Sequence, residues 1–139
     1  MLSSVLLFGT SLLLSGAEKV PNSIWNFNSM VKCRLQYGGY VYNNYGCYCG
    51  LGGKGEPVDG IDECCRDHDH CYDDITTCGK RMGKLRRYTA YYKWECVDHK
   101  PKCDDKNNEC AMATCECDRI AVECWANYTK PTSKPKCPS

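Results

Sequence analysis

The sequence has almost no excess charge, because 18 lysines and arginines oppose 17 aspartates and glutamates and leave a net charge of +1. That balance removes any general electrostatic argument for nucleic-acid binding. The chain also lacks internal repeats and low-complexity tracts, and beyond its N-terminus it lacks an apolar run long enough to cross a membrane. At 139 residues, we therefore expect one soluble domain.

Phenylalanine is scarce, with two residues against ten tyrosines, so we expect an aromatic core with many hydroxyls that need hydrogen-bond partners. Cysteine shows the opposite bias. Fourteen cysteines make up about a tenth of the chain, which is typical of disulfide scaffolds in small secreted proteins. The even count permits full pairing, although spacing alone leaves on the order of 10^5 connectivities open.

The N-terminus has the features of a secretory signal peptide. The apolar run "VLLFGTSLLL" is too short to span a bilayer, and small residues follow it at Ser15 and Ala17. We expect cleavage after Ala17, although the usual basic segment before the apolar run is missing. A buried core helix is the alternative, and it fits the cysteine-rich remainder less well. The signal peptide, residues 1–17, predicts a secreted, extracellular protein.

Apolar spacing and capping residues predict three helices, at about 23–35, 59–78 and 106–126. Seven glycines between Tyr37 and Gly55 predict an irregular loop. Further along, residues 88–103 predict a short hairpin with its turn near His99 to Pro101.

The segment "CCRDHDHCYDD", Cys64 to Asp74, fits a metal cage, a catalytic site or a disulfide-stapled helix. On a helix, His68 and His70 point about 200° apart and cannot share one small site. His68 shares a stripe with Cys64 and Tyr72 that we expect to face another helix, whereas His70 looks solvated. A zinc cage needs free thiolates, which an exported cysteine-rich chain rarely keeps.

The second candidate segment for a site is "YGCYCGLGG", which we call the glycine loop (Tyr45–Gly53). Its glycines tolerate unusual dihedral angles, so backbone carbonyls can bend inward. Calcium binds six to eight oxygens, typically carbonyls together with a carboxylate. A loop facing Asp69 would supply such a set. Taken alone, the same loop also fits a plain stapled turn.

Together these segments resemble the secreted phospholipases A2 of the pancreatic and elapid-venom type (group I). The glycine loop resembles that family's calcium loop, and "CCRDHDHCY" resembles its active-site helix. Two further segments, "SIWNFNSMVKC" and "CECDRIAVECW", resemble its N-terminal helix and its second catalytic helix. The resemblance implies a mainly α, disulfide-rich fold with an N-terminal helix, a calcium loop, two long antiparallel disulfide-linked helices and a short β-hairpin. It covers residues 23–137, so we expect residues 18–22 to form a possible propeptide and residues 23–139 the phospholipase A2 domain.

The resemblance also implies the roles of individual residues. His68 would be the general base, oriented by Asp118, which in turn would be held by Tyr72 and Tyr92. The calcium ligands would be Asp69 and the carbonyl oxygens of Tyr48, Gly50 and Gly52. The Gly50 amide would also meet the substrate oxyanion, and Tyr88 would reach the lipid phosphate. The implied disulfides are Cys33–Cys96, Cys47–Cys137, Cys49–Cys65, Cys64–Cys124, Cys71–Cys117, Cys78–Cys110 and Cys103–Cys115.

Two functions are consistent with these residues. The first is calcium-dependent hydrolysis of the sn-2 ester of phosphoglycerides at a membrane or micelle surface. The second is a non-catalytic, toxin-like or receptor-binding module on the same scaffold, with an unknown receptor. The segment "KRMGKLRR" reads either as a solvated loop or as a contact for anionic lipid. Its cations are Lys80, Arg81, Lys84, Arg86 and Arg87.

Overall fold

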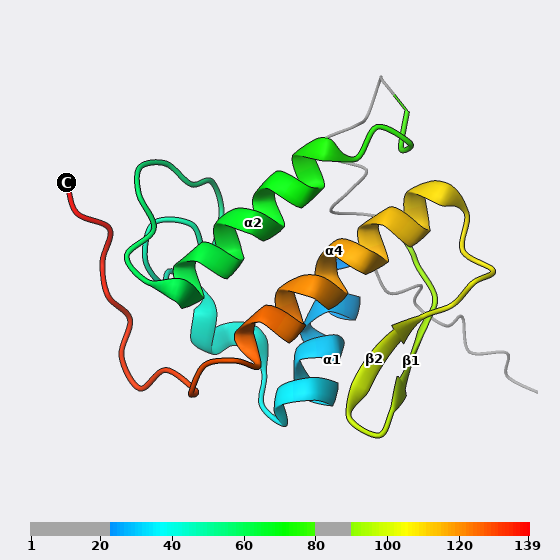
Figure 1. Cartoon of the computed structure of the whole chain (residues 1–139), viewed down its shortest axis with the longest axis horizontal. Coiled ribbons are helices and arrows are strands. Elements are labelled where there is room, and N and C mark those ends of the chain that lie inside the picture. Colours follow the sequence, from blue (N-terminus) through cyan, green and yellow to red (C-terminus); the bar gives the residue numbers. More distant parts are fainter. Residues whose placement is uncertain (1–22, 80–89) are drawn as a thin grey trace, which may run out of the picture.

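The computed structural model describes residues 23–79 and 90–139 (Figure 1). The predicted signal peptide, the possible propeptide, the basic segment and Tyr88 lie outside the described residues. Three α-helices, a two-stranded antiparallel sheet and seven disulfides make up the described part, which confirms the expected mainly α, disulfide-rich fold. None of the described helices is both long and apolar enough to cross a bilayer.

Helix α1 (Ser23–Leu35) forms where the apolar spacing predicted it. Met30 and Val31 are fully buried in the core, and the helix packs against α4. At its N-terminal end, Ile24 and Trp25 remain more than half exposed. The helix therefore has one face in the core and an apolar tip in solvent.

Helices α2 (Gly60–Asp74) and α4 (Glu109–Trp125) are both capped by side chains. The Asp59 side chain accepts a hydrogen bond from the Asp62 amide, and Asn108 accepts one from the Ala111 amide. The predicted boundaries were wrong at the start of α4 and at the end of α2. Helix α4 begins at Glu109 rather than Lys106, because Asn108 is the cap.

Helix α2 ends at Asp74, four residues before the predicted end at Cys78. The next residues are Ile75, Thr76 and Thr77, and β-branched side chains lose rotamer freedom in a helix. Ile75 is extended, with φ −70° and ψ 108°, and its amide closes the last turn on the Tyr72 carbonyl. Three successive poor helix formers therefore explain the early end.

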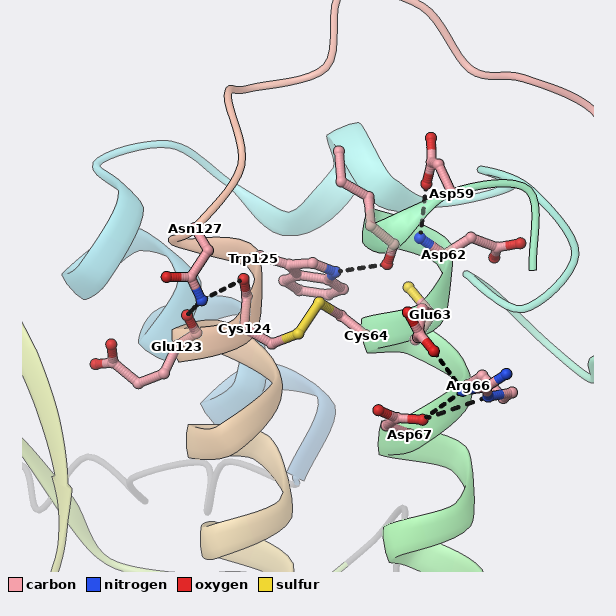
Figure 2. The surroundings of a disulfide bond; sticks show 12 residues. Asp59, Asp62, Glu63, Cys64, Arg66, Asp67, Glu123, Cys124, Trp125 and Asn127 are labelled. Carbon is pink, nitrogen blue, oxygen red and sulfur yellow. Dashed lines mark hydrogen bonds and ion pairs between the residues drawn. A yellow bond between two sulfur atoms is a disulfide. The ribbon is translucent and has the colours of Figure 1, made fainter.

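The two long helices lie side by side and run antiparallel (Figure 1). Two disulfides, Cys64–Cys124 and Cys71–Cys117, link them, and the seven pairs in the structure are the seven that the resemblance implies. Figure 2 shows the Trp125 indole pointing from α4 toward α2, where its Nε1 donates to the Ile61 carbonyl at 3.3 Å. All fourteen cysteines are paired, which leaves no thiolate for the zinc alternative.

Two details differ from the sequence expectations. The hairpin of β1 (Trp94–Val97) and β2 (Lys100–Cys103) turns at Asp98 and His99, which both have positive φ. Pro101 lies in β2, where an edge strand tolerates its missing N–H. The predicted irregular loop also contains one 3₁₀ turn, η1 (Gly39–Tyr42).

The tyrosine hydroxyls of the core have hydrogen-bond partners, as the composition predicted. The hydroxyls of Tyr37 and Tyr42 bond each other at 2.8 Å, and the Tyr45 hydroxyl donates to Asp59. The Tyr42 ring stacks on Trp125 with the ring centroids 3.9 Å apart. Burial raises the pKa of Tyr42 far above its ordinary value, so its hydroxyl stays protonated.

Candidate active site

His68 lies on α2 and faces α4. Its Nε2 is 2.7 Å from Asp118 Oδ1, and its side chain is 14% exposed. His70, two residues along the same helix, is exposed to solvent. Helical periodicity therefore predicted both positions correctly, with His68 in the interior and His70 in solvent.

Asp118 is fully buried on α4 and has hydrogen bonds to both of its oxygens. Oδ1 accepts from His68 and from the Tyr72 hydroxyl at 2.7 Å, and Oδ2 accepts from the Tyr92 hydroxyl. Burial raises the pKa of Tyr92 strongly, and the adjacent Asp118 charge adds to this shift, so Tyr92 remains a donor. The carboxylate is therefore fixed by three donors, two from α2 and one from the segment before β1.

The imidazole of His68 is also held by an aromatic contact. The Phe27 ring from α1 stacks on it, with centroids 4.7 Å apart and planes inclined by 26°. Sequence analysis missed this contact. The helical spacing places Phe27 on the apolar side of α1, but nothing in the sequence indicates which residue it meets.

His68 and Asp69 open into a pocket of about 450 Å³. Most of its wall is apolar and comes from α1, the glycine loop and α4. These wall residues are Ile24, Phe27, Val31, Leu51 and Trp125. The pocket therefore presents a polar end, with the histidine and a carboxylate, to a ligand with long apolar parts.

The glycine loop forms one side of this pocket through Tyr48, Gly50 and Leu51. Gly50 and Gly52 have φ values of +141° and +74°, which a residue with a Cβ rarely adopts. Among the described residues, none donates a hydrogen bond to the carbonyl oxygens of Tyr48, Gly50 or Gly52. The loop therefore carries three carbonyl oxygens that the protein itself does not use.

Asp69 lines the same pocket and is half-buried. Burial raises its pKa to about 6, and the nearby His68 opposes that shift. Within residues 23–79 and 90–139, no hydrogen bond or ion pair reaches this carboxylate. A half-buried anion without a partner is a natural ligand for a cation.

The available donors suit a hard cation. The described residues contain no cluster of three or more His, Cys, Asp or Glu side chains that could hold a metal, so an ion here would depend on backbone oxygens. One carboxylate and several carbonyls match the preference of calcium. Tyr48, Gly50 and Asp69 line one pocket, while Gly52 lies outside its lining.

Comparison with known proteins identifies the family of the chain. A sequence model of the family described as Phospholipase A2 matches residues 24–136. Basic phospholipase A2 DE-1 of Hemachatus haemachatus is 41% identical over 75% of this chain and 85% of its own, and phospholipase A2 of Bos taurus is 38% identical over 87% and 88%. The acidic phospholipase A2 homolog textilotoxin D chain of Pseudonaja textilis is 36% identical over 89% and 86%. The chain belongs to the phospholipase A2 family of lipid-hydrolysing enzymes.

Proposed function

We propose that this protein is a secreted, calcium-dependent phospholipase A2. It would hydrolyse the sn-2 ester of phosphoglycerides to a lysophospholipid and a free fatty acid. The observation that carries the proposal is the bond between His68 and Asp118 at the polar end of an apolar pocket, beside Asp69, whose carboxylate no described residue bonds.

His68 is proposed to act as the general base. Because its Nε2 donates to Asp118, its Nδ1 carries the lone pair and can take a proton from a water molecule that attacks the ester carbonyl. Asp118 then stabilises the imidazolium, and its bonds to Tyr72 and Tyr92 keep it in place. The same imidazolium can return the proton to the departing alcohol, which completes hydrolysis without a serine or cysteine nucleophile.

The carbonyls of Tyr48, Gly50 and Gly52 and the Asp69 carboxylate are proposed to hold calcium. When bound, calcium supplies positive charge that polarises the ester carbonyl. The Gly50 amide is proposed to donate to the oxyanion that develops during attack. Within the described residues, neither these carbonyls nor the Asp69 carboxylate has a hydrogen-bond partner, which supports this assignment.

A lipid surface is the proposed location of the reaction. Leu51 is fully exposed, and Ile24 and Trp25 are exposed on α1, with Ile24 and Leu51 at the pocket itself. Such apolar side chains favour contact with a membrane or micelle. Tyr88 is proposed to reach the lipid phosphate, and the basic segment 80–87 to favour anionic lipid.

The test is fatty-acid release from phosphatidylcholine vesicles, first with calcium and then with a chelator. We expect release only with calcium, and release by the His68→Gln variant should be lower on the order of 10^3-fold. A repeat with anionic vesicles should raise the rate if segment 80–87 contacts lipid. Export is tested separately by N-terminal sequencing of protein secreted from eukaryotic cells, which should begin at Glu18 or Ser23.

A non-catalytic binding module is the second candidate, because one relative at 36% identity is named a phospholipase A2 homolog. Loss of catalysis on this scaffold would be expected to show as a replaced His68, Asp69 or loop glycine, and all of these are retained. If vesicles release no fatty acid with or without calcium, the binding module replaces the enzyme as the better proposal.

A further inference from the structure

Asp62 is a buried carboxylate to which the proposed reaction assigns no part. It lies in the first turn of α2 and is 0% exposed. Asp62 and Asp69 are seven residues apart, about two helical turns, so both project from the same side of α2. That side faces the glycine loop.

The Asp62 side chain bonds two successive amides of this loop. Its Oδ2 accepts from the Cys47 amide at 2.7 Å, and its Oδ1 accepts from the Tyr48 amide at 2.8 Å. A third bond, from the Val58 amide to Oδ2 at 3.0 Å, holds the segment that returns to the helix. One carboxylate therefore fixes both the entry to the loop and the exit from it.

The backbone passes Asp62 too closely for any side chain at Gly46. A Cβ there would lie 2.3 Å from Asp62 Cγ, and the φ of Gly46 is +63°. On its other side, the Gly46 amide donates to the Pro135 carbonyl at 2.9 Å, and Cys47 is bonded to Cys137. The base of the loop is thus clamped between α2 and the C-terminal segment, while Leu51 at its tip is fully exposed.

We propose that Asp62 is a positioning residue for calcium binding. It fixes the base of the glycine loop so that the Tyr48 and Gly50 carbonyls point toward Asp69. Because the same helix carries Asp62 and Asp69, the loop carbonyls and the carboxylate are held in register by one rigid element. This inference rests on the proposed function, since it concerns the same ion site.

The chemistry of the position makes an isosteric test possible. An asparagine side chain has one acceptor oxygen, whereas its NH₂ group can only donate. In Asp62→Asn, at least one loop amide would therefore face another donor, and the loop would lose its fixed base. Partners that orient metal ligands typically contribute about 10- to 100-fold to metal affinity.

The experiment measures calcium binding by isothermal titration calorimetry on the intact, disulfide-bonded protein. We expect Asp62→Asn to raise the calcium Kd about 10- to 100-fold, while kcat at saturating calcium stays within a few-fold. The matched control is Asp67→Asn on the same helix, which is exposed and pairs only with Arg66, and it should keep the wild-type Kd. If Asp62→Asn lowers the Tm but leaves the calcium Kd unchanged, Asp62 only stabilises the fold and the inference is overturned.

A glycine pair tests the same inference if Asp62→Asn does not fold. Gly46→Ala and Gly55→Ala both place a side chain at positive φ, but only the Gly46 Cβ meets Asp62. We expect Gly46→Ala to weaken calcium binding and Gly55→Ala to leave it unchanged. Equal Kd values for the two variants would overturn the inference and leave the proposed function intact, whereas a wild-type protein that binds no calcium would overturn both.

Discussion

The two halves of the site are built in opposite ways. The His68–Asp118 half lies between two helices joined by two disulfides, and both Asp118 oxygens are bonded. The glycine-loop half is fixed at its base and by the Cys49–Cys65 disulfide, and its carbonyls and Asp69 have no protein partner among the described residues. The first half is complete as folded, whereas the second would be completed by the proposed calcium ion. Changes in the first should therefore affect turnover, and changes in the second should first affect calcium.

The largest effect is expected from Asp69→Lys, which should remove both calcium binding and turnover. The lysine ammonium would occupy the place of the ion, so calcium binding should be lost. Turnover should fall on the order of 10^4-fold, because the positive charge at the ester carbonyl contributes several kcal/mol. Calcium titration and vesicle hydrolysis check this, with Asp67→Lys as the exposed control that should retain both. Calcium-dependent turnover in the Asp69 variant would contradict the ligand assignment.

The second-largest effect is expected from a substitution in the His68–Asp118 half alone. His68→Gln should lower turnover on the order of 10^3-fold, since it removes the general base, yet it should leave the calcium Kd unchanged. The control is His70→Gln, an exposed neighbour that should keep wild-type turnover. Vesicle hydrolysis and calorimetry on the same preparations make the comparison. Equal damage from both substitutions would show that the helical-face argument is wrong.

A pH titration tests the glycine-loop half separately, because the carboxyl with the raised pKa, Asp69, belongs to that half. Asp69 has a pKa of about 6, so protons should compete with calcium below that pH. We expect the calcium Kd to rise by up to about tenfold for each pH unit below 6. Calorimetry from pH 7 to pH 5 measures the shift. A Kd that does not change over this range would argue against Asp69 as a ligand.

The same pKa also predicts a stability trend. The native carboxyl binds its proton more tightly than the unfolded one, so the calcium-free protein should become less stable as pH rises from about 4 to about 6. Saturating calcium should reverse this loss above pH 6. Thermal melts with and without calcium follow both effects, and Asp69→Asn should lack them.

The smallest effect is expected from Tyr92→Phe, which removes one donor from Asp118 and keeps the ring. Leaving Oδ2 without a partner should cost about 1–3 kcal/mol of folding stability. Turnover should fall only several-fold, because Tyr72 and His68 still hold Oδ1. Thermal melts and vesicle hydrolysis test this, and an altered calcium Kd would show that the two halves are not separable.

The parts of the molecule that sequence could predict depend on local geometry. The extent of α1, the solvated position of His70 and the inward face of His68 all follow from helical periodicity. Composition predicts that the tyrosine hydroxyls need hydrogen-bond partners, but only the resemblance names a partner, Asp118 for Tyr72 and Tyr92. The seven disulfide pairs came from resemblance, because spacing alone leaves the pairing open.

The missed features depend on contacts between segments far apart in the chain. Phe27 and His68 are 41 positions apart in the sequence, and Asp62 is fourteen or fifteen positions from the loop amides that it bonds. The hairpin turn was placed too late because Pro101 looked like a turn residue, while Asp98 and His99 adopt the positive φ values instead. Helical or strand periodicity within a short segment reveals neither contacts between distant segments nor the φ values of turn residues.

The disulfide from Cys47 to Cys137 spans 90 positions along the chain. During synthesis, Cys47 leaves the ribosome long before Cys137 exists, so the outer clamp on the glycine loop cannot close until Cys137 has been made. A chain interrupted before that point would keep Cys47 as a thiol beside the proposed calcium loop. The loop would thereby stay without its outer clamp until its distant partner is added.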